Sequence, residues 1–317
     1  LNASSTQTLQ GLDTIDGGAG TDTVNVVFNT AGTYAPTLSN IETVNTTTSA
    51  NITLDLVGST SVATVKSTGS TGTVTVNNIS SASASLTVQS SNQNHTFDFA
   101  NTAVSGTADS ATVTVSGVTG GTLTVDAGIE TLNLVSAGSA NTIATLTATG
   151  ANTLNISGGQ AITITAANTV SETINASSAT GVVTLTSDND QATTITTGSA
   201  ADAVTLTGTN AVTETVSTGA GNDKVTFSAS LDDVDVLDGG AGTDTLGGID
   251  ADLGSLTSTA TTSNITNFEV IEISDDLDGN LDVSDVQESG ITTVTLAENG
   301  AALLTNGIET ITGEAGS

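Results

Sequence analysis

Glycine and aspartate recur together in short segments of this 317-residue chain. Residues 17–24 read Gly-Gly-Ala-Gly-Thr-Asp-Thr-Val, and residues 239–246 repeat them except for a final Leu. Residues 218–225 form a third copy that lacks only the first glycine, and residues 198–204 form a degraded fourth. Glycine permits turns that aim successive carbonyl oxygens inward, and the aspartate adds a hard anionic oxygen. Because calcium binds about six to eight such oxygens, these segments predict calcium-binding turns.

The aspartates of three of these segments share one spacing. Asp202, Asp223 and Asp244 are 21 residues apart, which is the period expected if each belongs to one coil of a repeating fold. They would then stack along one edge of the molecule. Stacked carboxylates repel one another unless cations lie between the coils, so the spacing also favours Ca²⁺.

Apolar residues follow the same period and indicate the elements that hold these turns. Short alternations of Thr with Val, such as residues 73–76 and 112–115, predict strands. One apolar series contains Ile162, Val183, Val204, Val225 and Leu246, and a second contains Ile174, Ile195, Val216 and Leu237. A unit of about 21 residues with two short strands cannot bury its own apolar face, so its copies must stack. We therefore expect an all-β, parallel β-solenoid with about 21 residues per coil, and an antiparallel β-sandwich is the alternative.

The regularity of the repeat suggests three regions. Residues 1–135 are expected to be an irregular solenoid that opens with a Gly/Asp turn, residues 136–248 a regular 21-residue solenoid, and residues 249–317 an acidic insertion followed by a return to solenoid strands. The chain lacks an initial Met and ends in another Gly-rich segment, so we expect a fragment of a longer protein. The acidic cluster, a solvated loop or alternatively a second calcium site, comprises Asp275, Asp276, Asp278, Asp282 and Asp285.

Composition excludes several functions. The chain has 33 acidic and 2 basic residues, a net charge of −31, which excludes binding to nucleic acid and to anionic membranes. No apolar run reaches the length of a membrane-spanning helix, so we expect no membrane insertion. Cys is absent and aromatic residues are 2%, so a thin aliphatic core stabilised by metal rather than by disulfides is expected.

The groups that catalyse reactions are scarce. The chain has one His and two Lys, and His95 lies between Asn94 and Thr96 in a polar segment that reads as a surface turn. Acid–base chemistry on acidic sugars needs cationic or proton-transferring groups. We therefore expect no enzyme activity and no cofactor other than Ca²⁺, with the solenoid portion of a secreted polysaccharide-acting enzyme as the weakest alternative.

The Gly/Asp segments fit the nonapeptide G-G-x-G-x-D-x-U-x of RTX proteins. Four elements in which Glu follows Ile or Phe accompany them, at residues 40–44, 128–132, 267–271 and 307–311. With its Thr-, Ala-, Ser- and Gly-rich composition, the whole chain resembles RTX-type calcium-binding bacterial surface-layer (S-layer) proteins. It departs from the usual RTX pattern because the nonapeptide occurs at most once per coil rather than in tandem.

The resemblance implies that calcium binds between successive coils. The side-chain ligands would be Asp22, Asp223 and Asp244, with Asp16 and Asp238 contributing and Asp202 the weakest candidate. The backbone ligands would be the carbonyls of Gly18, Gly20, Gly219, Gly221, Gly240 and Gly242. The resemblance further implies type I secretion, attachment to the bacterial cell surface through regions outside this chain, and self-association into a two-dimensional lattice. An RTX-type secreted adhesin is the alternative.

Overall fold

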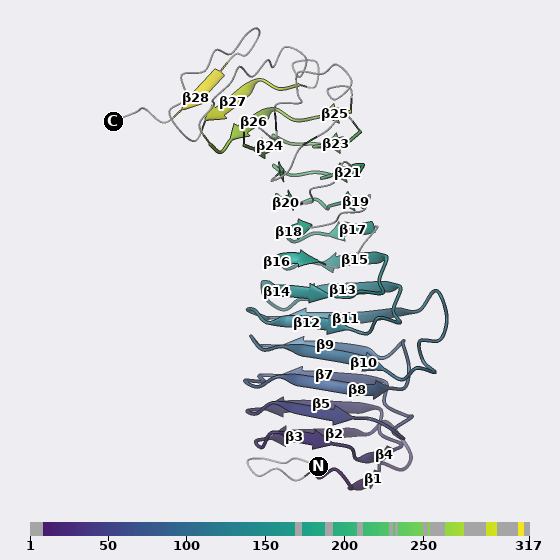
Figure 1. Ribbon diagram of the computed structural model, residues 1–317. Helices are drawn as coiled ribbons and strands as arrows, with labels where there is room; N and C mark the ends of the chain where they lie inside the picture. Colours follow the sequence, from purple (N-terminus) through teal and green to yellow (C-terminus); the bar gives the residue numbers. More distant parts are fainter. Residues whose placement is uncertain are drawn as a thin grey trace. The chain divides into compact units, whose positions relative to one another are not determined.

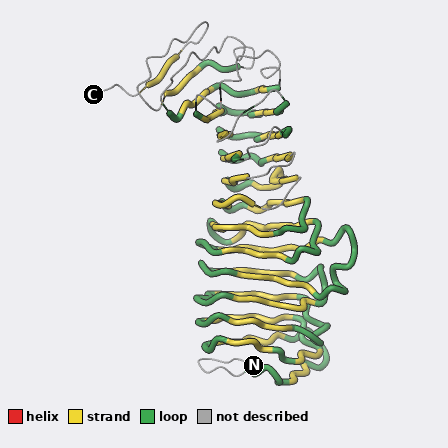
Figure 2. Tube along the Cα trace, viewed as in Figure 1, coloured by secondary structure: helices red, strands yellow, loops and turns green. Residues whose placement is uncertain are grey.

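The computed structural model describes residues 9–168, 173–187, 193–207, 212–227, 231, 234–249, 253, 264–275, 290–296 and 310–313. The chain forms two compact units, Leu1–Val170 and Ser171–Ser317. In each unit parallel strands stack as a β-solenoid whose coils are roughly 21 residues apart (Figure 1, Figure 2). The expected fold class is therefore confirmed, and the antiparallel sandwich is excluded.

The first unit has two long walls. One wall contains β3 (Gly32–Tyr34), β6 (Ile52–Asp55), β8 (Val74–Ile79), β10 (His95–Phe99), β12 (Thr122–Val125), β14 (Asn141–Thr147) and β16 (Ile162–Asn168). The other contains β2 (Thr23–Phe28), β5 (Thr43–Thr48), β7 (Thr64–Thr68), β9 (Ser85–Gln89), β11 (Ser110–Ser116), β13 (Thr131–Ala137) and β15 (Thr153–Gly158). A small separate sheet pairs β1 (Thr14–Asp16) with β4 (Thr37–Ser39).

The second unit repeats this arrangement with shorter strands. One wall contains β18 (Val183–Ser187), β20 (Ala203–Leu206), β22 (Lys224–Phe227), β24 (Thr245–Gly248), β26 (Val270–Ile273), β27 (Thr293–Leu296) and β28 (Thr310–Gly313). The other contains β17 (Thr173–Ala179), β19 (Thr193–Thr196), β21 (Glu214–Ser217), β23 (Val236–Asp238) and β25 (Ile265–Thr266). Because each strand continues into a turn at the same corner of its coil, the Gly/Asp turns stack.

The core consists of the inward residues of both walls, which alternate with outward polar residues as strand geometry requires. Val44 pairs with Val65, which pairs with Leu86, at 21 residues per coil. Leu86 then pairs with Val113, 27 residues later. The extra residues lie in the loop before β11 that projects from the coils in Figure 1. The upstream region is therefore stacked like the rest, and a longer loop hides its period in the sequence.

The register agrees with one apolar series and with Val204, Val225 and Leu246 of the other, but corrects that series at one step. Ile195 pairs with Ile174 and with Val216, as the 21-residue spacing predicts. Val204, however, pairs with Leu185 rather than with Val183. The backbone N–H of Val183 donates instead to Oδ1 of Asp202, at 2.7 Å. A shift of two residues keeps the same face inward, so the core is preserved.

Several sequence predictions stay untested by the fold. The three-region division remains a prediction. Residues 276–285 of the acidic cluster and residues 307–309 of the last Ile-Glu element lie outside the described residues. In the part of the chain that the structure describes, no helix has the length and apolar character needed to cross a membrane.

Candidate metal site

Three Gly/Asp turns stack in consecutive coils of the second unit. Ala241 donates its N–H to the carbonyl of Gly219 at 2.9 Å, and Gly221 donates to the carbonyl of Ala241 at 2.9 Å. One coil earlier, Ala220 donates to the carbonyl of Gly198 at 3.0 Å. The turns are therefore held in direct backbone contact, which brings their aspartates together.

Glycine is required in these turns for two reasons. The φ angle of Gly240 is 80°, a left-handed conformation that side chains disfavour. A Cβ atom on Gly242 would also lie only 1.5 Å from the carbonyl oxygen of Gly221. A Cβ atom on Gly240 would likewise lie 2.0 Å from the carbonyl oxygen of Gly219. The turns thus pack backbone against backbone, and only glycine leaves room for this approach.

The aspartates form a ladder along this edge. Asp202 donates its N–H to Oδ1 of Asp223 at 2.6 Å, and Asp223 donates its N–H to Oδ1 of Asp244 at 2.8 Å. Asp244 in turn donates its N–H to Oε2 of Glu269 at 2.7 Å. One oxygen of each carboxylate therefore accepts a hydrogen bond from the backbone of the preceding coil.

The second carboxylate oxygen distinguishes the three turns that contain the Gly-x-Gly pair. Among the described residues, three buried side-chain oxygens have no hydrogen-bond partner, and they are Oδ2 of Asp22, Asp223 and Asp244. The side chains of Asp223 and Asp244 are 1% and 0% exposed. Leaving a charged oxygen buried without a partner is costly. These three residues are the aspartates of the three best nonapeptide copies.

Asp202, the weakest predicted ligand, is bound differently. Its Oδ1 accepts the N–H of Val183, and its Oδ2 accepts the N–H of Gly198 at 3.0 Å. A similar closure occurs in the first unit, where Oδ2 of Asp109 accepts the N–H of Gly106 at 2.9 Å. A turn without the Gly-x-Gly pair thus satisfies its own carboxylate, whereas a turn that has this pair leaves an oxygen for another partner.

Burial opposes charge on the carboxyls of Asp223 and Asp244. It raises the pKa of Asp223 to about 6, and the neighbouring charges of Asp202 and Asp244 act in the same direction. The N–H of Asp202 and the Thr218 hydroxyl oppose this pKa shift, although the hydroxyl donates its proton to the carbonyl of Gly239 at 2.8 Å. Burial also raises the pKa of Asp244. A cation beside these oxygens would reverse the penalty.

Asp16 and Asp238 brace the starts of their turns. Oδ1 of Asp16 accepts the N–H of Gly18 at 3.0 Å and the side-chain amide of Asn40 at 2.8 Å. These bonds lower the pKa of Asp16, with the Asn40 amide the larger cause. Oδ1 of Asp238 is held in the same way, by Gly240 at 3.0 Å and Asn267 at 2.7 Å. These oxygens therefore shape the turns in both units.

The glutamates of the Ile-Glu and Phe-Glu elements complete the turns, a role that sequence reasoning missed. Oε2 of Glu42 accepts the N–H of Asp22 at 2.8 Å, as Glu269 does for Asp244. Oε2 of Glu130 accepts the N–H of Asp109 at 2.7 Å. The sequence does contain a signal for these pairs, because each glutamate follows its aspartate by 20 to 25 residues, or about one coil.

His95 is buried, which corrects its interpretation as a surface residue. It is 2% exposed because its strand position faces the core, in register with Val74 and Leu123. Nδ1 lies 2.9 Å from the carbonyl of Gln93, which can only accept, so Nδ1 carries the proton. Nε2 therefore accepts the hydroxyl proton of Ser67, 3.0 Å away. Burial lowers the pKa of His95.

The donor set is suited to a hard cation. No three His, Cys, Asp or Glu side chains gather at one point within the described ranges, so a cation would take one carboxylate oxygen and several backbone carbonyls. Such an all-oxygen set is typical of Ca²⁺ rather than of transition metals. Comparison with protein-family models, curated proteins and solved structures finds no match. A proposal of function therefore rests on the geometry of the turns.

Proposed function

We propose that this chain is a calcium-stabilised structural component of a bacterial surface layer. The observation that supports calcium binding is the set of three unpartnered, buried Oδ2 atoms on Asp22, Asp223 and Asp244. The same oxygen of Asp202, in the degraded turn, accepts a backbone N–H instead. The carbonyl oxygen of Gly221 lies against the next turn and would serve as a backbone ligand, while the carbonyl of Gly219 already accepts the N–H of Ala241.

Calcium would act by linkage between binding and folding. A cation that binds the folded turns but not the unfolded chain adds its binding free energy to folding. In a cell, where free calcium is scarce, repulsion among the aspartates would keep the turns loose enough for type I secretion. Outside the cell, calcium would neutralise the buried carboxylates and stiffen the coils.

One wall of the first unit carries a stripe of uncharged residues through which copies could assemble. This wall carries the same outward residue type, threonine, in six successive strands. These paired residues are Thr33, Thr53, Thr75, Thr96, Thr124 and Thr147. The stripe is uncharged, but Asp55 and Asp98 face outward on the same wall, so cations would have to screen these carboxylates before two copies approach each other.

Two measurements test this proposal. The melting temperature should rise in millimolar calcium relative to excess chelator, and an unchanged transition would remove the calcium proposal. Electron microscopy after calcium addition should show ordered two-dimensional sheets. Separate rods that instead adhere to a solid or cellular surface would favour the adhesin.

A further inference from the structure

Thr48, Ser67, Ser70 and His95 form a buried hydrogen-bond network, the His95 network, that connects the two walls of the first unit. Nε2 of His95, in β10, lies 3.0 Å from Oγ of Ser67, in β7 of the opposite wall. Oγ of Ser67 lies 3.0 Å from Oγ of Ser70, which accepts the N–H of Thr48 at 3.3 Å. All four residues are at most 2% exposed. The network therefore joins three successive coils inside the core.

The direction of every hydrogen bond in the His95 network is fixed. Nδ1 of His95 donates to the carbonyl of Gln93, so the unprotonated Nε2 accepts the single hydroxyl proton of Ser67. Ser67 has no proton left, and Ser70 must therefore donate to it. The N–H of Thr48 completes the network at Ser70. Donors and acceptors are thus matched only while His95 is neutral.

The stacking of the coils does not require a histidine at this position. The residues that pair with His95 in the adjacent coils are Val74 and Leu123. Ser67 likewise pairs with Val88 in the next coil. Because aliphatic side chains fill the equivalent inward positions, the polar pair adds a titratable contact that the fold itself does not need.

No charged group among the described strands around the imidazole faces it. The strands β8, β9, β11, β12 and β14 contain no charged residue. β7 and β10 contain one each, Lys66 and Asp98, and both point outward. A proton on His95 would therefore bring an uncompensated positive charge into the core.

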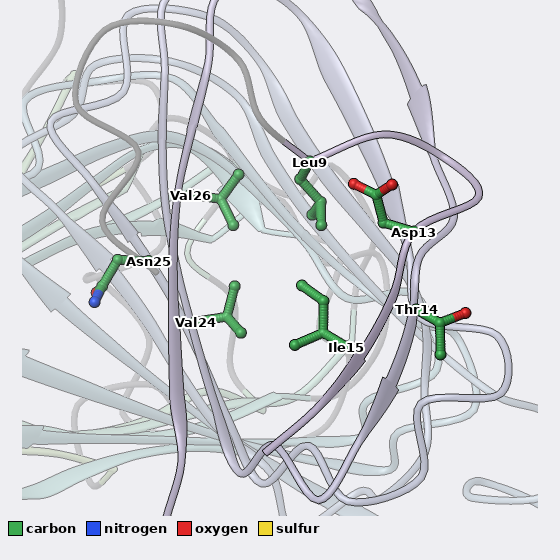
Figure 3. Close-up of a pocket in the computed structure, with 7 residues that line it drawn as sticks. All are labelled: Leu9, Asp13, Thr14, Ile15, Val24, Asn25 and Val26. Carbon is green, nitrogen blue, oxygen red and sulfur yellow. The ribbon is translucent and has the colours of Figure 1, made fainter.

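The cavities of the first unit differ in what lines them. The hollow between β1 and β2, of about 180 Å³, is larger, but aliphatic side chains point into it, namely Leu9, Ile15, Val24 and Val26 (Figure 3). A much smaller cavity, of about 10 Å³, lies against His95, the only histidine of the chain. Its volume leaves room for about one water molecule. A charged imidazole therefore cannot be hydrated here unless the coils separate.

We infer that protonation of His95 is a switch that opens the His95 network, and with it this corner of the first unit, in acid. Protonation adds a donor at Nε2 and removes the acceptor that Ser67 uses. The ring keeps its bond to Ser67 only if the hydroxyl protons reverse, which takes away the acceptor of Ser70. In either arrangement one buried donor loses its partner, and separation of the coils admits water to it and to the ring. The switch rests on this geometry and is independent of calcium.

Amide hydrogen exchange of the 317-residue chain in saturating calcium, between about pH 5 and about pH 8, tests the inference. The opened state binds the proton with the ordinary pKa of 6.5, and burial lowers the pKa of His95 in the closed state. After correction for intrinsic exchange, the amide of Thr48 should lose protection below pH 6.5, by up to about tenfold per pH unit. The amide of Leu56, which donates to the carbonyl of Asn77 past the far end of β6, is the internal control and should keep its protection.

His95→Gln is the matched variant, because it keeps one donor and one acceptor at every pH and retains all carboxylates. It should abolish the loss of protection at Thr48 in acid. An equal loss in the variant would overturn the switch, since carboxylates would then be the cause. Losses of the same size at Thr48 and Leu56 would also overturn it, because they indicate unfolding of the whole unit.

Nuclear magnetic resonance of the single imidazole supplies a readout without substitution. At about pH 8 the ring should carry its proton on Nδ1, and it should titrate below pH 6.5 together with the loss of protection at Thr48. A proton on Nε2 at that pH would overturn the assigned direction of the network. Protonation of His95 with no loss of protection at Thr48 would overturn the switch.

Discussion

Oδ1 of Asp244 accepts the backbone N–H of Asp223 at 2.8 Å, while Oδ2 of the same carboxylate is buried without a hydrogen-bond partner. One oxygen thus couples two coils, and the other is available to a ligand. A cation at Oδ2 would strengthen the same contact that Oδ1 makes, because it would hold the carboxylate in its charged form. Under the proposed function, metal binding and coil stacking would therefore be linked at this residue.

Asp223→Asn should reduce the stabilisation by calcium. A bound site adds about 2.7 kcal/mol when calcium is one hundred times the dissociation constant, and the amide removes the anionic oxygen that binds it. Asp202→Asn is the control, because both oxygens of Asp202 already accept N–H groups. Melting in calcium and in chelator should show the calcium increment reduced in the first variant and unchanged in the second. Equal increments in both variants would contradict the assignment.

Alanine at the two equivalent glycines should have very different effects. Gly20→Ala meets no described neighbour within 4 Å and adds only the strain of a φ angle of 123°, about 1 kcal/mol. Gly242→Ala places Cβ 1.5 Å from the carbonyl of Gly221, so the stacked turns must separate. Chemical denaturation should show a severalfold larger loss of stability for Gly242→Ala. Similar losses would mean that the turns are not stacked as described.

Glu269→Ala should destabilise the second unit by about 1–3 kcal/mol, because it leaves the N–H of buried Asp244 without its acceptor. Glu272→Ala, in the same coil, removes an exposed ion pair with Lys224 and should cost less than about 1 kcal/mol. Denaturant midpoints compare the two directly. A larger effect at Glu272 would show that the surface ion pair, rather than the Glu269 bond, fastens this coil.

The His95 site should make the first unit sensitive to acid. Burial lowers the pKa of this imidazole below its ordinary value of 6.5, so the unfolded chain binds the proton more readily. The stabilisation that comes from keeping His95 neutral is therefore fully present above about pH 6.5. It is lost as the pH falls toward the pKa of the folded state. His95→Gln, which keeps a donor and an acceptor, should flatten this dependence. Urea denaturation between pH 5 and about pH 7.5 checks it, and an equal slope in both proteins would contradict it.

The sequence predicted the fold because equivalent core residues recur once per coil, so the spacing of the apolar residues gives the coil length. It could not predict the pairing of Leu86 with Val113, because a loop adds residues without changing the stack. The glycine pattern identified the aspartates with unpartnered oxygens, since backbone conformation there depends on glycine. His95 was misread because its polar neighbours disguise an inward strand position.

The capping glutamates escaped prediction for a different reason. Glu42 and Glu269 act on aspartates one coil earlier, but at separations of 20 and 25 residues. A search at a fixed period of 21 does not join these pairs. Contacts between coils of unequal length become visible only once the register is known.

Equilibrium dialysis with calcium, on the parent chain and on a variant with Asp22, Asp223 and Asp244 all changed to Asn, measures binding at the candidate oxygens most directly. The parent chain should bind calcium at these turns, and the triple variant should lose that binding while retaining its β-sheet circular dichroism. Equal calcium binding by the two folded proteins would contradict the central claim.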